Sequence, residues 1–248
     1  MKFNMKKVIS ISLLLVLIGP GILRAQEDTV PDLKNALKLN TMALILNNGS
    51  FIYERNLRGP WSIQAGAGYR YGGGVPKVLD LGDLILTSET KGIKGYSFTP
   101  EVRYYFRNCE CPASMAGLYL GLYTRYTKFF GDLSFHYWTG SEYIDLLSAS
   151  SYRELGMGFQ LGYQLAIKKR FLVDFMFAGP RLSTNKIRCT IDSDYLDELV
   201  PAIEEEINKR LEWLGQDPVS VDLLESNTVE ARFGLKSFRY GISIGYLF

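Results

Sequence analysis

The sequence predicts an all-β fold: an eight-stranded antiparallel up-and-down transmembrane β-barrel with a helical insertion in its last external loop. Three observations lead to this prediction. The chain opens with an export signal, and apolar residues then alternate repeatedly with small or polar ones. A period of two is typical of strands that have one apolar face. No apolar stretch after the signal reaches the roughly 18 residues of a membrane helix, so a membrane protein of this kind would cross with strands.

The first 25 residues are organised as a secretory signal peptide. Three lysines precede an almost wholly apolar run over residues 8–23, and Ala25 supplies the small residue of a cleavage site. A retained membrane anchor is the alternative, but the run is short and contains Gly19-Pro20-Gly21. The predicted parts are a signal peptide (1–25), a periplasmic tail (26–36) and the barrel (37–248).

The charge balance changes once the signal is removed. The whole chain has 28 Lys and Arg against 26 Asp and Glu, and the signal holds four of the cations and none of the acids. The mature chain is therefore left with 24 against 26, a net charge of −2. The slight basicity belongs to the export segment, and we expect no nucleic-acid partner.

Eight strands are expected, and an even number is typical of single-chain bacterial barrels. The expected strands cover about residues 37–46, 51–56, 61–71, 101–107, 118–123, 154–165, 171–178 and 238–248. An Asn-Asn-Gly-Ser turn at 47–50 separates the first two strands. Long connections over 72–95, 132–151 and 183–229 alternate with shorter ones, as external loops alternate with periplasmic turns.

The final segment, FRYGISIGYLF, has the clearest alternation. Its aromatic and aliphatic face would meet lipid, while small or polar residues such as Ser243 would face the interior. The terminal aromatic also resembles the C-terminal signature that the barrel-assembly machinery reads during biogenesis. The predicted assembly signal consists of Tyr240, Ile242, Ile244, Tyr246 and Phe248.

Charged residues of both signs fall on the inner faces of the expected strands. The predicted lumen charge network consists of Lys38, Glu54, Arg70, Glu101, Arg103, Arg125, Glu154, Asp174 and Arg239. An eight-stranded barrel is just wide enough to be filled by side chains. We therefore expect a salt-bridged plug, and the alternative is a narrow polar passage or small-ligand site.

The last connection, 183–229, contains apolar residues at helical spacing between Asp192 and Gly215. The apolar stripe either packs on its own neighbours or forms a surface for an extracellular partner. Outer-membrane lipid is the other expected partner.

Few residues could support catalysis or metal binding. His136, the only histidine, lies near Ser134 and Glu142, but their spacing does not match a lipid A deacylase motif. Three cysteines, Cys109, Cys111 and Cys189, are an odd number that argues against a disulfide framework. We expect no enzyme, no cofactor and no metal site.

The segments TPEVRYYF, GLYLGLYTRY, GMGFQLGYQLAIKKRFLVDF and YGISIGYLF carry a family resemblance. In order and turn placement they resemble a Bacteroidetes family of outer-membrane barrels catalogued as a domain of unknown function, DUF3575, related in style to OmpA and OmpX. The resemblance covers most of residues 37–182 and 230–248. It implies a barrel architecture and an outer-membrane location, but no activity.

The leading functional hypothesis is therefore a structural or surface-interaction role that acts through the external loops. A narrow channel or transporter and a lipid-modifying enzyme are the competing hypotheses. A soluble exported barrel that binds lipid is a further alternative, and it would need another element to cover Tyr240, Ile242 and Ile244.

Overall fold

The structure is a computed structural model, and part of the chain is described in it. The described residues are 33–45, 48–71, 86–87, 93–106, 115–138, 143–167, 170–191, 196–213, 215–224 and 227–248. The predicted signal peptide (1–25), most of the predicted tail, and Cys109 and Cys111 lie outside them.

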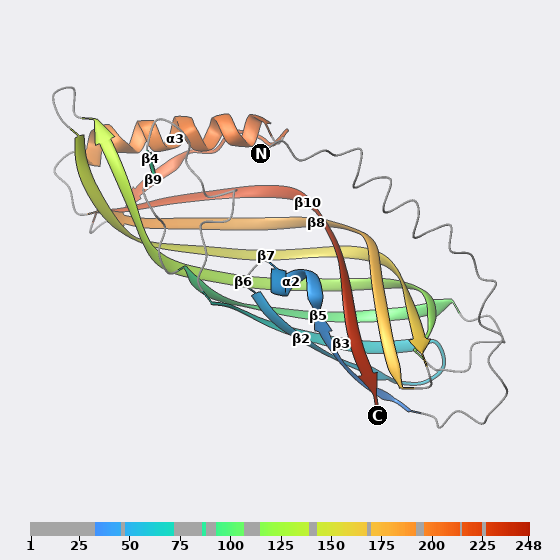
Figure 1. Cartoon of the computed structure of the whole chain (residues 1–248). Coiled ribbons are helices and arrows are strands. Elements are labelled where there is room, and N and C mark those ends of the chain that lie inside the picture. The colour runs from blue at the N-terminus through green and yellow to red at the C-terminus, as the bar shows by residue number, and fades with distance from the viewer. Residues whose placement is uncertain are drawn as a thin grey trace, which may run out of the picture. The chain divides into compact units, whose positions relative to one another are not determined.

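Eight antiparallel strands close into a ring, which confirms the predicted all-β barrel (Figure 1). These strands are β1 (Asn35–Asn40), β2 (Asn48–Asn56), β3 (Trp61–Tyr71), β5 (Lys94–Phe106), β6 (Gly117–Trp138), β7 (Tyr143–Ile167), β8 (Phe171–Ile191) and β10 (Thr228–Leu247). Each pairs with the next of these strands, and β1 pairs with β10, where Leu37 lies opposite Tyr246. Two short strands add to this sheet: β4 (Leu86–Thr87) pairs with β6, and β9 (Val221–Leu224) pairs with β10.

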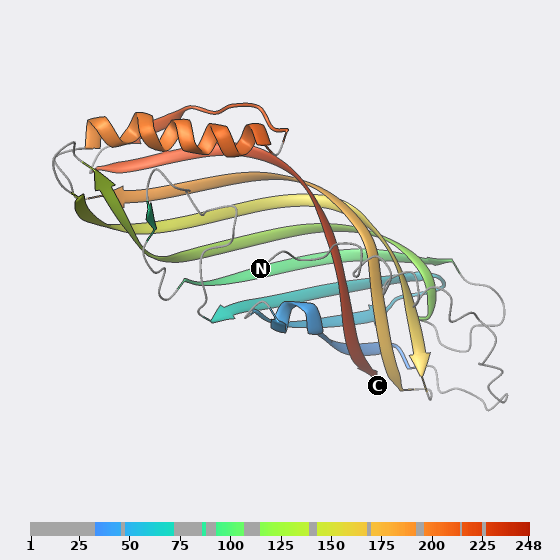
Figure 2. The same ribbon diagram turned by 45° about the horizontal axis from the view of Figure 1, so that its top comes forward.

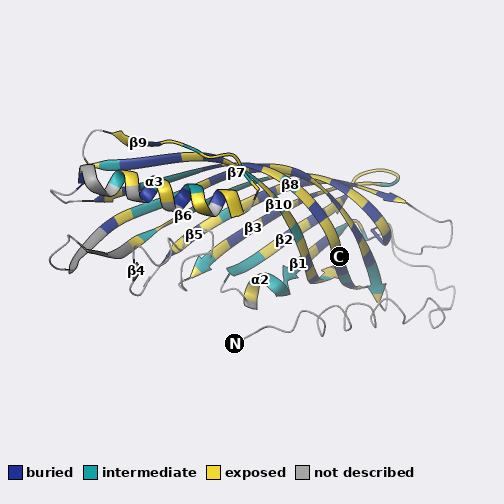
Figure 3. Cartoon of the chain, turned by 90° about the horizontal axis from the view of Figure 1, so that it is seen from above, coloured by how far each residue is buried: buried dark blue, intermediate teal, exposed yellow. Residues whose placement is uncertain are grey.

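The expected alternation divides each strand into an inner and an outer face, seen as alternating buried and exposed residues in Figure 3. On β3, for example, Trp61 and Ile63 are exposed while Ser62 and Gln64 are buried. Small residues on the inner face make room for large neighbours. A Cβ on Gly162 would clash with the hydroxyl of Tyr119, its cross-strand partner.

The first predicted strand, 37–46, is wrong in its second half. The strand ends at Asn40, and Thr41–Ile45 form the short helix α2. The Asn40 side-chain oxygen accepts a hydrogen bond from the Ala43 amide at 3.0 Å, which is the interaction of a helix N-cap. The predicted turn at 47–50 is also wrong, because β2 already begins at Asn48.

One predicted long loop is mostly strand, and another is shorter than predicted. The loop predicted over 132–151 is wrong, since β6 continues to Trp138 and β7 begins at Tyr143. The loop predicted over 183–229 narrows to the segment between Ile191 and Thr228. At about 3.3 Å per residue, the 25 residues of β7 measure roughly 80 Å. Strands β6, β7, β8 and β10 therefore extend well beyond β1–β3 (Figure 2). We call the projecting part of these four strands the extension.

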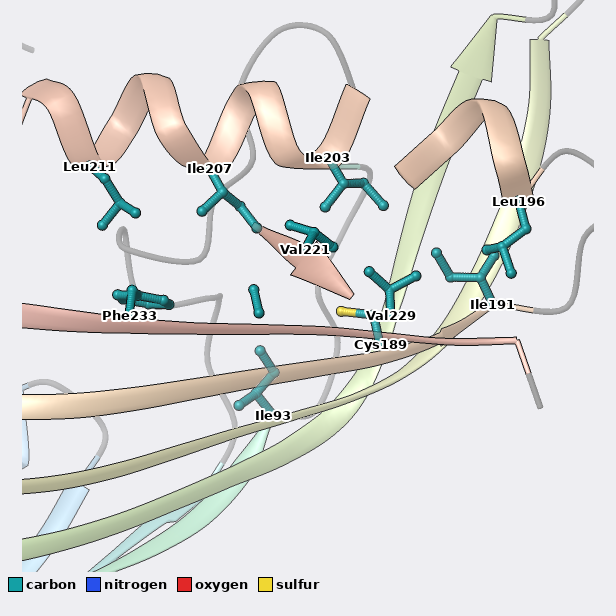
Figure 4. Close-up of a cluster of buried hydrophobic side chains, with 11 residues drawn as sticks. Ile93, Cys189, Ile191, Leu196, Ile203, Ile207, Leu211, Val221, Val229 and Phe233 are labelled. Atoms are coloured by element: carbon teal, nitrogen blue, oxygen red, sulfur yellow. The ribbon is translucent and has the colours of Figure 1, made fainter. Parts of the chain in front are cut away.

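The predicted helical segment forms α3 (Leu196–Trp213), which lies against the inner face of the extension. The apolar side chains of α3 point toward the sheet in Figure 4 and meet Cys189, Val229 and Phe233 there. The buried residues that α3 contributes are Leu196, Ile203, Ile207 and Leu211. Of the two alternatives for the apolar stripe, the structure shows packing on its own neighbours.

The position of Cys189 gives a direct test of this packing. Its thiol is buried under α3, and burial raises its pKa, so both access and thiolate content are reduced. In a chain carrying Cys109→Ser and Cys111→Ser, we expect maleimide to label the folded protein about 100-fold more slowly than the urea-unfolded protein. Ile207→Asp should remove most of this protection, whereas Lys209→Asp on the exposed side of the helix should not. Equal labelling of the two variants would contradict the packing of α3.

Candidate functional site

Lys38 of β1 lies inside the ring with its side chain fully buried. The ammonium Nζ lies 2.6 Å from Glu54 Oε2 and 2.8 Å from Asp174 Oδ2. It donates a third hydrogen bond, of 3.0 Å, to Gln164 Oε1. An ammonium has three donors, so this contact set uses all of them.

Arg103 of β5 joins the same acids from the other side of the lumen. Its Nη1 lies 2.7 Å from Asp174 Oδ2 and 3.7 Å from Glu54 Oε2, and its Nε donates to Glu101. The guanidinium also lies 4.0 Å from the ring centroid of Tyr119, a cation–π contact. Lys38 and Arg103 therefore share two carboxylates.

Hydroxyl groups satisfy the remaining oxygens of these two carboxylates. Ser62 and Tyr105 each donate to Glu54 Oε1 at 2.6 Å. The Tyr119 hydroxyl donates to Asp174 Oδ1 at 2.7 Å. A buried charge is tolerated only when it is paired and hydrogen-bonded, and both acids meet this requirement.

Glu101 connects a third cation to the network. Gln64 donates to Glu101 Oε2 at 3.0 Å, and Gln160 donates to the other carboxylate oxygen. Arg239 Nη1 lies 4.0 Å from Glu101 Oε2 and donates to Gln160 Oε1 at 3.3 Å. Three acids and three cations, contributed by β1, β2, β5, β8 and β10, thus form one connected group, which we call the lumen network. The lumen network consists of Lys38, Glu54, Glu101, Arg103, Asp174 and Arg239.

The other three residues of the predicted lumen charge network lie elsewhere on the inner face. Glu154 pairs with Arg181 at 2.9 Å in a separate cluster. Arg125 is partly buried and donates to a threonine of its own strand. Arg70 lies 5.7 Å from the ring centroid of Phe129, at the apolar core of the extension. The structure therefore joins six of the nine predicted residues.

Neutral polar side chains complete the site, and a prediction based on charge omits them. Gln160 and Gln164 fall on the inner face by alternation, and this was the available signal. Arg181 is missing for a different reason: the strand predicted there ends at residue 178, and extending the count would not recover Arg181, because the β7–β8 register shifts between Leu161 and Gly162. A bulge reverses the alternation of inner and outer residues, so a count along β8 from Asp174 places Arg181 on the wrong face.

The interior of the barrel differs on the two sides of the lumen network. Near the ends of β5 and β8, an apolar cluster includes Tyr105, Met115, Leu172 and Leu247. Toward the extension, a polar cavity of about 40 Å³ has Arg125 and Arg239 in its lining. Such a cavity has room for a few waters. Along its length the lumen thus changes from an apolar cluster to the lumen network and then to a polar cavity.

The residues considered for catalysis do not form a described site. Ser134 and His136 lie on β6, with His136 opposite Asp145 of β7, and Glu142 lies outside the described residues. Within the described part of the chain, no group of three His, Cys, Asp or Glu side chains could hold a metal ion. Cys189 is a free, buried thiol.

The fold and the lumen together define a closed antiparallel β-barrel with an interior filled by ion-paired side chains. A family model described as "Protein of unknown function (DUF3575)" matches residues 11–179, more than half of the chain, so the chain belongs to this family. No curated protein matches the chain, and no solved structure matches it. Among the described helices, none is both long and apolar enough to cross a membrane.

Proposed function

We propose that this chain is an integral outer-membrane barrel of the OmpA and OmpX style, with a plugged lumen and a surface-exposed extension that carries any binding activity. One observation carries the proposal: an apolar belt on the outer face of the ring, to which all eight strands contribute. The belt residues are Leu37, Phe51, Tyr53, Trp61, Ile63, Tyr69, Phe98, Val102, Tyr104, Phe106, Leu118, Leu120, Leu122, Leu155, Met157, Phe159, Leu161, Tyr163, Ile167, Phe171, Phe177, Leu182, Phe238, Tyr240, Ile242, Ile244, Tyr246 and Phe248.

The height of the belt fits a bilayer. On β7 the belt runs from Leu155 to Ile167. Arg153, two residues before Leu155, is an exposed charged residue outside the belt. Twelve steps of about 3.3 Å give roughly 40 Å along the strand. At the tilt of about 45° typical of such barrels, this corresponds to roughly 28 Å, close to the apolar band of about 25 Å around outer-membrane barrels.

The soluble alternative requires an element that covers the belt. The described helix long enough to do so, α3, is already packed on the inner face of the extension. On β10, Tyr240 remains 68% exposed and Ile244 49%. An apolar surface of this extent marks a membrane or protein contact. Lipid is the partner that can surround all eight strands at once.

The plug favours an anchoring role over transport. The lumen network occupies the interior with paired charges whose hydrogen bonds are internal, whereas a channel needs a continuous hydrated path. The outward side of α3 carries Glu205, Lys209 and the 85% exposed Trp213, which are available to an extracellular partner. Exposed tryptophans are frequent binding hot spots. The described residues offer no comparable support for a lipid-modifying enzyme, and the Bacteroidetes origin remains a prediction.

Membrane fractionation tests this proposal most directly. The folded chain should be recovered in the outer-membrane fraction and should migrate faster on gels before boiling than after it. A wholly soluble periplasmic product would overturn the membrane proposal.

Conductance in planar bilayers tests the plugged lumen. The purified protein should give no conductance, and steady ion conduction would contradict the plug and favour the channel hypothesis. Altered lipid A in the mass spectrum after gene deletion would favour the enzyme hypothesis.

The C-terminal residue should matter for assembly more than for folded stability. The Phe248 amide donates to Asn35 O at 2.8 Å and its carbonyl accepts from Asn35 N at 3.1 Å, so ring closure uses only its backbone. We expect Phe248→Ser to reduce the assembled protein in the outer membrane several-fold, while the variant refolded in detergent unfolds at nearly the same urea concentration. Phe51→Ser, another exposed belt aromatic, should assemble normally. Equal surface levels of all three proteins would contradict this role of Phe248.

A further inference from the structure

A row of basic residues crosses the outer wall of the extension just beyond the apolar belt. Lys128 lies directly opposite Arg153, Arg153 opposite Lys186, and Lys186 opposite Arg232. The row thus crosses β6, β7, β8 and β10 without a gap. On β7 it lies two residues beyond Leu155, where the belt ends. We call Lys128, Arg153, Lys186 and Arg232 the basic row.

The basic row faces away from α3. The residues that alternate with it along these strands belong to the apolar core beneath the helix, or pack against that core, and successive strand residues point to opposite faces. These inward-facing neighbours are Phe129, Ile187, Ala231 and Phe233. The four basic side chains are therefore on the same outer surface as the belt.

This arrangement carries more positive charge than the neighbouring acids balance. Like charges directly opposite on adjacent strands, about 4.8 Å apart, destabilise the pair. Glu230 accepts from Lys186 at 2.6 Å and from Arg232 at 2.7 Å, and also from Arg188 at 2.5 Å. Burial alone would raise the pKa of Glu230, but these three hydrogen bonds outweigh it and lower the pKa to about 2. One carboxylate, always ionised at neutral pH, is thus shared by three cations.

The other half of the basic row has no such partner. Among the described residues, no carboxylate forms an ion pair with Lys128 or Arg153. Asp222 lies across from Glu230 on β9. Asp132 lies four residues beyond Lys128 on β6, roughly 13 Å along the strand. The wall therefore presents unbalanced cations at one level of the barrel.

Tyrosines continue the basic row toward β3. Tyr96 of β5 lies opposite Lys128, and Tyr69 of β3 lies opposite Tyr96, both with exposed rings. Tyrosine is enriched where a barrel leaves the hydrocarbon and enters the headgroup layer. The tyrosines and the basic row thus mark one boundary of the belt.

We propose that the basic row binds the phosphate groups of a phosphorylated glycolipid of the outer leaflet, whose acyl chains lie along the belt below Arg153. This inference rests on the proposed function, because headgroups reach this level only if the belt is in the bilayer. Lysine and arginine form charge-assisted hydrogen bonds to phosphate, and arginine can do so with two donors at once. The row spans three strand spacings, roughly 14 Å, which is wide enough for two phosphates of one headgroup.

The test uses the full mature chain refolded in detergent and titrated with bis-phosphorylated lipid A. We expect Lys128→Gln with Arg153→Gln to raise the dissociation constant about tenfold, because two charge-assisted contacts are lost. The matched control, Arg55→Gln with Arg58→Gln, removes two exposed cations at the opposite end of the strands and should leave binding unchanged. The wild type should bind lipid A without phosphates more weakly than it binds bis-phosphorylated lipid A. The row variant should bind the two lipids with the same affinity.

Three results would overturn the inference. The row variant could bind within twofold of the wild type, or dephosphorylated lipid A could bind as tightly as the phosphorylated form. Competition by inorganic phosphate at equal concentration would assign the row to a soluble anion. Insertion into plain phosphatidylcholine vesicles separates this inference from the membrane proposal. If the protein inserts into these vesicles but binds lipid A equally well with and without phosphates, only the proposed role of the basic row is disproved. If the protein inserts into no vesicle, the membrane proposal itself is disproved.

Discussion

Replacing Asp174 with alanine should lower the free energy of unfolding by about 3–5 kcal/mol, the usual cost of removing one partner from a buried ion pair. Asp174 accepts from Lys38 at 2.8 Å, from Arg103 at 2.7 Å and from the hydroxyl of Tyr119. Its removal would leave three cations against two acids in the lumen network, where Lys38 and Arg103 are buried among packed side chains and would lose a charge partner. Urea unfolding in lipid vesicles, followed by tryptophan fluorescence, measures the change.

Two further variants separate the charge of Asp174 from the general effect of substitution. Asp222→Ala removes an exposed carboxylate from β9 and should change the free energy of unfolding by no more than about 0.5 kcal/mol. Lys38→Met combined with Asp174→Asn restores a balance of two acids and two cations. The double variant should therefore lose less stability than the sum of its two single variants. Additive losses would show that Lys38 and Asp174 act independently, and the lumen network would not be a coupled unit.

The sequence predicts the barrel where the two strand faces differ most. Between Leu155 and Leu165, apolar residues alternate with glycine and glutamine, so both the strand and its inner face are evident. Beyond Arg153 the outer face of β7 becomes polar while the inner face of the extension turns apolar. A search for apolar outer faces consequently ends at the edge of the belt. Much of the extension is therefore predicted as loop.

The partners within the lumen could not be predicted in the same way. Alternation identifies which residues point inward, and this was enough to propose Lys38, Glu54 and Asp174 together. The contact between Lys38 and Asp174, however, joins positions 136 residues apart and depends on ring closure and on the register of every strand between them. A single bulge in β8 is sufficient to misplace Arg181. The membership of the lumen network was therefore predictable in part, and its pairing was not.

Leu161→Arg should destabilise the barrel in a bilayer by about 2–4 kcal/mol, because Leu161 lies midway along the belt on β7. The same substitution at Leu155, at the edge of the belt, should cost at most about 1 kcal/mol, since a charge near the headgroups remains hydrated. Unfolding in urea from phosphatidylcholine vesicles measures both values. The difference between them depends on depth in the membrane, a variable that has no counterpart in water.

Leu223→Arg supplies the matched control for this pair. Leu223 is 45% exposed, close to the 41% of Leu161, but it lies on β9 outside the ring. An exposed leucine in water can become arginine with a change of about 0.5 kcal/mol or less. If the belt faced water, all three variants would therefore behave alike and the soluble alternative would be favoured. A large loss at Leu161, a small loss at Leu155 and none at Leu223 has one physical explanation: hydrocarbon surrounds the middle of the belt and ends near the level of the basic row.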